Sequence, residues 1–163
     1  MSEEVLNTSE YLRAEKAALR LISRAEQCTA GLARKLEKRK FDTACINAVI
    51  SHLCEIGLLD DNRFARLWLE SRLRLARSPR RLLSALCARG IARDDAEAAV
   101  KNVLDEDAEN SMLAKFAARF AKQIAKKHAH KSDGEGEDVT RKLKYLLKSE
   151  GFSQTAIQSF LEN

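Results

Sequence analysis

One apolar spacing recurs three times along this chain of 163 residues. Each copy has two leucines four positions apart, an aromatic residue or isoleucine five positions later, and two more apolar residues five and four positions beyond. The copies begin at Leu32, Leu82 and Leu143, and their third apolar residues lie 50 and 61 positions apart. Such periods are in or near the range of helical repeats. The chain is therefore predicted to be an array whose function lies on a surface made by repeats and not in one enzyme cleft.

Helix is the predicted secondary structure throughout. The chain has one proline, Pro79, and six glycines, while residues that favour helices dominate its composition. The apolar residues of the repeated spacing also follow helical periodicity. We predict an all-α fold of three tandem three-helix units that form an elongated, curved array.

The predicted organisation divides the chain into three repeats. Residues 1–10 have no clear period and are predicted to fray. The repeats are predicted at 11–57, 58–107 and 108–163, with a mobile loop at about 128–138 where glycine, serine and acidic residues gather. Their first helices are predicted at 11–26, 62–77 and 109–127.

Residues typical of helix ends surround the second helix of each copy. Ser78 and Pro79 predict its start in the second copy, since serine caps a first turn and proline fits the first helical position. Gly90 and Gly151 predict a left-handed residue that ends this helix in the second and third copies. The equivalent residue in the first copy is Lys40. Either that turn differs, or the lysine adopts a positive φ at a cost of about 1 kcal/mol.

Charge is segregated along the chain, although the formal net charge is only +5. Residues 71–93 hold seven arginines and no acid, and residues 110–132 hold six lysines and arginines and no acid. Between them, residues 94–109 hold seven carboxylates and one lysine. This segregation indicates a polyanionic or acidic partner on one side of the array.

Basic residues beside the turns that enter the second helices are the candidate binding residues. They are Arg72, Arg74, Arg77, Arg80 and Arg81 in the second copy, with Lys122, Lys126, Lys127, Arg141 and Lys142 in the third. In a curved stack these turns would line up as a basic track suited to phosphates or acidic protein patches. The aromatic residues Phe64 and Trp68 are interpreted as core, and Tyr11 and Tyr145 are assigned to no site.

No catalytic, cofactor-binding or metal-binding residues are predicted. The chain has no phosphate-binding glycine loop and no evident nucleophile and base pair. Its four cysteines match no metal-binding spacing and are interpreted as reduced, structural thiols, which fits a cytoplasmic protein. No apolar run is long enough to cross a membrane. We also expect a monomer.

The segment that joins the first two copies carries the most specific pattern. Gly57 is predicted to end a helix, Leu58 and Leu59 to pack in the corner, and Asp61 to cap the next helix. The whole segment, Gly57-Leu58-Leu59-Asp60-Asp61-Asn62-Arg63-Phe64-Ala65, resembles the corner motif of the RecX family. Further resemblances follow in family order at Ala18–Arg24, Pro79–Leu86 with Arg89–Ile91, and Lys144–Ile157. Together they cover residues 14–162. Ser78 and Lys40 stand where the family usually has glycine, and Cys87 stands where it often has a charged residue.

The resemblance implies a regulator without chemistry of its own. RecX proteins modulate, and usually inhibit, the RecA recombinase by lying in the groove of the RecA filament on DNA. The implied partners are the RecA filament and DNA, mainly within that filament, and the implied processes are DNA repair, homologous recombination and the SOS response.

Two other function classes remain open. The first is a helical repeat protein that binds DNA directly without RecA, because a short helix, a turn and a longer helix also resemble a helix-turn-helix unit. The acidic third helix of the second copy weakens this alternative, since a recognition helix is expected to be basic. The second is an enzyme that uses the Cys and His residues, which has the least support.

Overall fold

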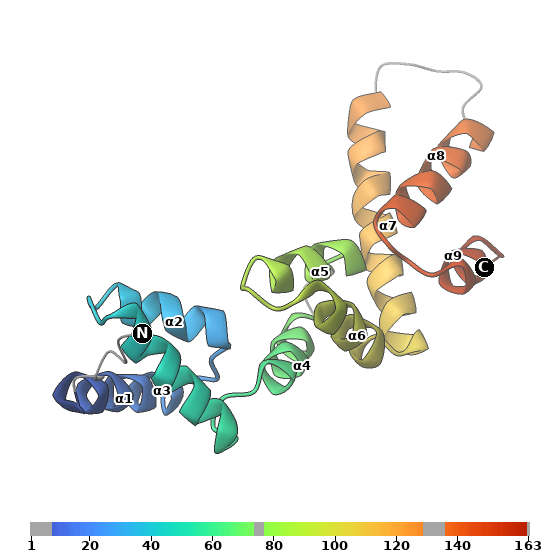
Figure 1. The fold of residues 1–163 in the computed structure, drawn as a ribbon. Coiled ribbons are helices and arrows are strands. Elements are labelled where there is room, and N and C mark those ends of the chain that lie inside the picture. The colour runs from blue at the N-terminus through green and yellow to red at the C-terminus, as the bar shows by residue number, and fades with distance from the viewer. Residues whose placement is uncertain (1–7, 74–76, 129–135, 163) are drawn as a thin grey trace. The chain divides into compact units, whose positions relative to one another are not determined.

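The computed structural model describes residues 8–73, 77–128 and 136–162. Within these ranges the backbone forms nine α-helices and no strand (Figure 1). The all-α class is therefore confirmed. The helices are α1 (Thr8–Ile22), α2 (Thr29–Glu37), α3 (Thr43–Glu55), α4 (Asp61–Arg72), α5 (Pro79–Cys87), α6 (Arg93–Val103), α7 (Glu106–His128), α8 (Gly136–Ser149) and α9 (Gln154–Glu162).

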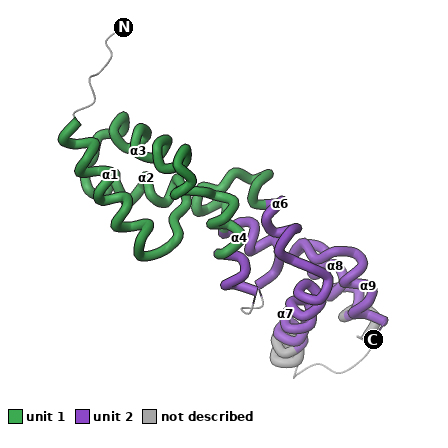
Figure 2. Tube along the Cα trace, turned by 90° about the horizontal axis from the view of Figure 1, so that it is seen from below, with its two compact units in different colours: residues 1–67, 86–96 green, residues 68–85, 97–163 purple. Residues whose placement is uncertain are grey.

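In chain order the helices form three groups of three, α1–α3, α4–α6 and α7–α9, which we call the first, second and third repeats. Figure 2 colours the chain by its two compact units, residues 1–67 with 86–96 and residues 68–85 with 97–163. The division crosses α4, α5 and α6, so each of these helices has residues in both units. The repeat boundaries after residues 57 and 107 stay predictions.

The core of the first repeat is built from the recurrent apolar residues. Leu32 and Leu36 of α2 and Ile46 of α3 are at most 1% exposed. Burial of each of these side chains stabilises the fold by about 1.5–3 kcal/mol. The first helix contributes Ala14 and Ala18, both fully buried, and all three helices pack against one another.

The third repeat is packed in the same way. Its helices α7, α8 and α9 all contact one another, and Leu113, Leu147 and Ile157 are at most 1% exposed. The Phe116 ring of α7 lies against the ring of Phe152, with centroids 5.6 Å apart and planes at 56°. This tilted geometry is favourable for two aromatic rings. The face of α7 that carries Leu113 and Phe116 therefore packs into the third repeat.

The turn between the second and third helices has the same backbone in all three repeats. Its key residue has a φ of 66° at Lys40, 96° at Gly90 and 86° at Gly151. In each turn the next amide donates to the leucine carbonyl five positions earlier, at N···O distances of 3.4, 3.3 and 3.2 Å. These bonds satisfy carbonyls that the helix end leaves open. Of the two alternatives for Lys40, the positive φ is the one adopted.

The corner between the first two repeats corrects one prediction. Asp60, not Asp61, caps α4, because its Oδ1 accepts from the amides of Asn62 and Arg63 at 2.9 and 3.0 Å. Asp61 already lies in the first turn of α4. Its carboxylate accepts from the amide and hydroxyl of Thr29, both at 2.7 Å, and so caps α2 instead.

Carboxylates at the equivalent position cap helices in the other repeats too. Glu10 and Glu109, like Asp61, each lie four residues before a fully buried residue of a first helix. Glu10 accepts from the amide of Asp42 at 2.9 Å, and Glu109 accepts from the amide and hydroxyl of Ser153 at 2.6 and 2.8 Å. The longer glutamates therefore reach the third helix of their own repeat, whereas Asp61 reaches the second helix of the preceding one.

Arg63 holds the corner together. Its guanidinium donates to Glu26 at 2.7 Å and to the carbonyls of Gly57 and Leu58, both at 3.1 Å. Leu59 is buried as predicted, but Leu58 is 41% exposed, so only one of the two leucines packs in the corner.

The first helix ends earlier than predicted, at Ile22 and not at residue 26. Side-chain donors join the backbone amides there. The Ser23 hydroxyl donates to the carbonyl of Arg20 at 3.1 Å, and the Gln27 amide donates to the carbonyl of Ala25 at 2.8 Å. Such local bonds compete with continuation of the helix.

The fourth helix also ends early, at Arg72 and not at residue 77. The Ser71 hydroxyl donates to the carbonyl of Trp68 at 2.7 Å, again a local bond near a helix end. Residues 74–76, which the prediction included, lie outside the described residues.

Parts of the predicted frayed and mobile segments are helical in the structure. Helix α1 already includes residues 8–10, and α7 and α8 extend to residue 128 and from residue 136. The α7 start is fixed by Asp105, whose carboxylate accepts from the amide of Ala108 at 2.7 Å. The remaining parts of those two predictions, residues 1–7 and 129–135, lie outside the described residues.

Candidate partner-binding surfaces

Two of the predicted binding residues lie where α5 meets the turn between α8 and α9. We call this contact junction 2; it comprises Ser78, Pro79, Arg80, Arg81, Ser149, Glu150 and Gly151. The Arg80 amide donates to the carbonyl of Glu150 at 3.0 Å. The hydroxyl of Ser78, a fully buried residue, donates to the Glu150 carboxylate. Unsatisfied donors at the start of α5 thus meet unsatisfied acceptors at the end of α8.

The side chains of Arg80 and Arg81 extend from this junction. Arg80 Nη1 donates to the carbonyl of Ser149 at 3.2 Å, while Arg81 Nε lies 4.0 Å from Oε2 of Glu150. The Arg81 side chain is 70% exposed, so this ion pair contributes less than about 1 kcal/mol. Both arginines therefore touch the turn and still present positive charge to solvent.

An equivalent contact, which we call junction 1, lies in the other unit and comprises Cys28, Ala30, Arg34, Arg89 and Gly90. Here Cys28 Sγ and Arg34 Nη2 donate to the carbonyl of Arg89 at 3.5 and 2.8 Å. A Cβ on Gly90 would overlap the Cβ of Ala30. Junction 1, like junction 2, thus brings the start of a second helix to the turn of the next repeat, but through side-chain donors and a closer approach.

Two further predicted binding residues of the second repeat, Arg72 and Arg77, lie outside these contacts. The guanidinium of Arg72 lies 5.5 Å from the centroid of the Trp68 ring, and Arg77 is exposed. Phe64 and Trp68 are half-buried and not fully in the core, so that interpretation was only partly right. Arg74 lies outside the described residues.

In the third repeat, Arg141 and Lys142 are exposed on α8. The remaining predicted residues, Lys122, Lys126 and Lys127, are on α7, but their side chains lie outside the described part of the chain. The structure thus brings Arg80 and Arg81 to the end of α8. The continuous basic track stays a prediction.

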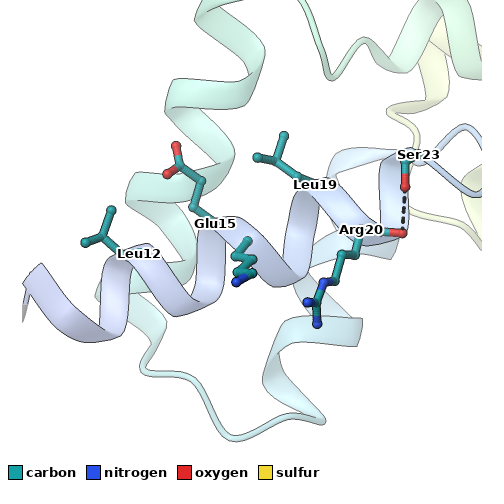
Figure 3. Close-up of a pocket in the computed structure, with 6 residues that line it drawn as sticks. Leu12, Glu15, Leu19, Arg20 and Ser23 are labelled. Atoms are coloured by element: carbon teal, nitrogen blue, oxygen red, sulfur yellow. Dashed lines mark hydrogen bonds between the residues drawn. The ribbon is translucent and has the colours of Figure 1, made fainter.

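A shallow groove on α1 was not predicted. It has a volume of about 440 Å³ and is lined by Leu12, Glu15, Lys16, Leu19, Arg20 and Ser23. Figure 3 shows that the labelled side chains of this groove all come from α1 and the residue that follows it. Leu12 and Leu19 are 57% and 41% exposed. Their spacing of seven residues was a visible signal for a shared helix face.

Two of the four thiols, those of Cys45 and Cys54, have a raised pKa, as expected of structural and not reactive cysteines. Burial raises the pKa of the Cys45 thiol, and the charges of Glu10 and Asp42 raise it further. A raised pKa keeps the thiol protonated and unreactive near neutral pH. In the part of the chain that the structure describes, no cluster of three or more His, Cys, Asp or Glu side chains could hold a metal ion.

Comparison with known proteins assigns the chain to a family. The model "RecX, first three-helix domain" matches residues 14–53, and "RecX, second three-helix domain" matches residues 60–100. The regulatory protein RecX of Mycobacterium tuberculosis is 33% identical over 146 residues, which cover 88% of this chain and 80% of that protein. The chain belongs to the RecX family. The resemblance drawn from the corner motif is thereby confirmed.

Two further RecX proteins extend this comparison. The regulatory protein RecX of Halorhodospira halophila is 39% identical over 102 residues, 63% of this chain and 60% of that protein, so the match spans less than two thirds of that relative. The crystal structure of RecX from Lactobacillus salivarius aligns with a TM-score of 0.73 over 94% of this chain and 96% of that one, at 19% identity. That likeness supports the helical repeat fold of RecX proteins. Among the described residues, no helix has the length and apolar character needed to span a membrane.

Proposed function

We propose that this protein binds the RecA filament on DNA and inhibits its recombinase and ATPase activities. Membership of the RecX family supports a regulatory role, since its relatives are named regulatory protein RecX. We assign the binding surface to junction 2, because Arg80 and Arg81 present exposed positive charge there. The protein would act by binding alone, as a monomer in the cytoplasm.

The chemistry of junction 2 suits an anionic partner. Guanidinium groups form bidentate hydrogen bonds with phosphates and carboxylates, which both occur on a protein filament wound on DNA. Arg80 and Arg81 start from a packed turn, so less conformational entropy is lost when they bind. Arg77, Arg141 and Lys142 are exposed and would extend the surface within the same compact unit.

The test measures DNA-dependent ATP hydrolysis and strand exchange by a RecA recombinase with substoichiometric amounts of this protein. Affinity for bare duplex and single-stranded DNA is measured beside it. Inhibition well below equimolar protein is the expected result. Tight binding to bare DNA with no effect on the recombinase would instead favour the direct DNA-binding alternative.

The surface is tested with Arg80→Ala combined with Arg81→Ala. Alanine is preferred to glutamate because an acid there would face Glu150 and disturb the junction. Loss of two charged contacts should raise the concentration for half inhibition about tenfold or more and flatten its salt dependence. The matched control is Lys16→Ala with Arg20→Ala, which removes two exposed charges from α1. Inhibition that survives in the first variant would show that the binding surface lies elsewhere.

A further inference from the structure

Tyr145 on α8 is unusually exposed for an aromatic residue. Its side chain is 76% accessible, the highest value among the large apolar side chains of the described residues. The next highest is Leu12 at 57%. A single exposed ring is ordinary on a protein surface, so its significance depends on the side chains that surround it.

The phase of the helix explains why Tyr145 is open. Leu147 is fully buried and Leu143 and Leu146 are half-buried, so one side of α8 packs into the third repeat. At 3.6 residues per turn, Tyr145 lies about 100° around the helix axis from Leu146 and about 160° from Leu143 and Leu147. The ring is therefore held on the outer face by a packed helix.

Positive charge brackets the ring along this face. Arg141, Lys142 and Lys148 are exposed and lie four and three residues before Tyr145 and three residues after it. Residues three and four apart are neighbours on a helix surface. With a rise of 1.5 Å per residue, cations stand about 6 Å before and about 4.5 Å after the ring along the axis.

We propose that this face of α8 binds single-stranded DNA, with an unpaired base stacked on Tyr145 and the flanking phosphates contacted by Arg141, Lys142 and Lys148. Aromatic rings joined to basic side chains are the common means of binding single strands without sequence preference. The four residues form what we call the α8 stacking face.

The aromatic ring decides between single strands and other anionic partners. Base pairs in a duplex are stacked on both sides, so a ring on a helix surface reaches none of their faces without unstacking them. Tyrosine and arginine are also common in protein interfaces, so an acidic protein patch is the competing partner, and the test below includes it as an outcome. A single strand uses both groups.

This inference stands apart from the proposed function, because it concerns bare strands and needs no recombinase. The probe is a fluorescein-labelled thymidine oligonucleotide, and its partner is an abasic strand of equal length that keeps the phosphates and lacks the bases. Affinity of the full chain for each is measured by fluorescence anisotropy at several salt concentrations. Circular dichroism of each variant checks that helicity is retained.

The decisive variants are Tyr145→Ala and Tyr145→Trp. Loss of one stacked base should weaken binding of the thymidine strand roughly 5- to 150-fold in Tyr145→Ala. Binding of the abasic strand should stay the same, and Tyr145→Trp should bind the thymidine strand at least as tightly as the native chain. Lys148→Ala should weaken both strands and reduce the salt dependence of binding.

The matched control is Leu12→Ala, which removes the second most exposed apolar side chain from another helix. It should leave both affinities unchanged. The proposal is overturned if Tyr145→Ala binds the thymidine strand as the native chain does, or loses affinity equally for the abasic strand. It is also overturned if the loss appears only with a recombinase filament and not on bare DNA, since the site would then belong to a protein partner.

Discussion

Junction 1 and junction 2 both bring the start of a second helix to the turn between the second and third helices of the next repeat, through different side chains. In junction 1 the second helix approaches the turn through Cys28 and Ala30, and in junction 2 through a buried serine and two arginines. Junction 2 also contains Glu150, whose side chain is 17% exposed. In both junctions a guanidinium donates to a carbonyl of the turn, and junction 2 also contains a carboxylate.

The comparison separates the backbone turn, which both junctions share, from the side chains around it, which differ. A left-handed residue and the hydrogen bonds around it occur in both turns. The side chains around this backbone differ, since Cys28 and Ser78 are buried at the helix starts whereas Arg80 and Arg81 are exposed. Charge at junction 2 can therefore serve a partner while the turn keeps its structure.

The largest expected effect tests how tightly each junction is packed. Gly90→Ala should destabilise by about 2–4 kcal/mol, because its Cβ overlaps Ala30 and its φ of 96° strains any side chain. Gly151→Ala should cost only about 1–2 kcal/mol, since its Cβ would lie 3.4 Å from the Arg80 amide nitrogen. Denaturant unfolding of the two variants and the native chain would measure both losses.

Gly57→Ala is the matched control for these two variants, because its φ is 72° and a Cβ there would meet nothing within 4 Å. Its cost measures backbone strain alone. If Gly90→Ala were no worse than Gly57→Ala, junction 1 would not be the close contact that the structure describes.

The second effect concerns the charged groups of junction 2. Glu150→Ala should lower the free energy of unfolding by about 1–3 kcal/mol, because the buried Ser78 hydroxyl loses its acceptor. Glu150→Gln keeps an acceptor of similar shape and should cost less. Equal losses in the two variants would mean that the charge of Glu150, and not its hydrogen bond with Ser78, stabilises the junction.

Sequence patterns predicted the shared turn but not the contacts made on it. Gly90 and Gly151 indicated the left-handed residue, because few other residues adopt that conformation without strain. Nothing near Arg80 along the chain indicated its contact with Ser149, which lies 69 positions away. Asp61 shows the same limit, since a cap assigned from neighbouring residues missed a partner 32 positions distant.

Exposure of Tyr145 could have been predicted from its place in the repeat. It lies two residues before Leu147, and two helical positions span more than half a turn. The recurrent leucines define the buried side of α8, so that phase was present in the sequence. The sequence also shows that cations lie three or four residues from Tyr145 along the helix. The exposed fraction of Tyr145 could not be predicted, because it depends on how much of α8 is covered by α7 and α9.

The third effect has the opposite sign. Lys40→Gly should raise the free energy of unfolding by about 1 kcal/mol, because Lys40 adopts a φ of 66° that a lysine reaches only with strain. Lys40 is exposed, so its side chain is tolerated at a turn where Gly90 has no room for one. Thermal unfolding measures the change. An unchanged or lowered melting temperature would show that other contacts of Lys40 outweigh its strain.

The smallest expected effect is a shift in the reactivity of the Cys54 thiol. It reports the negative charge beside junction 1, where Asp61 caps α2. Partial desolvation of the sulfur raises the pKa of the Cys54 thiol, although the residue is exposed, and Asp61, Asp60 and Glu55 raise it further. Thiolate is the reactive form, so alkylation should reach half its maximal rate at a higher pH than for an ordinary cysteine. The stability that the protonated Cys54 thiol contributes is present below the ordinary cysteine pKa and is lost as pH rises through the raised pKa of the folded protein.

Salt screens the charges of the carboxylates but leaves the desolvation of the sulfur unchanged. The pH at which alkylation is half-maximal should therefore fall in high salt without reaching the ordinary cysteine value. Peptide-level mass spectrometry of alkylated protein follows Cys54 alone, and a midpoint insensitive to salt would remove these carboxylates as a cause.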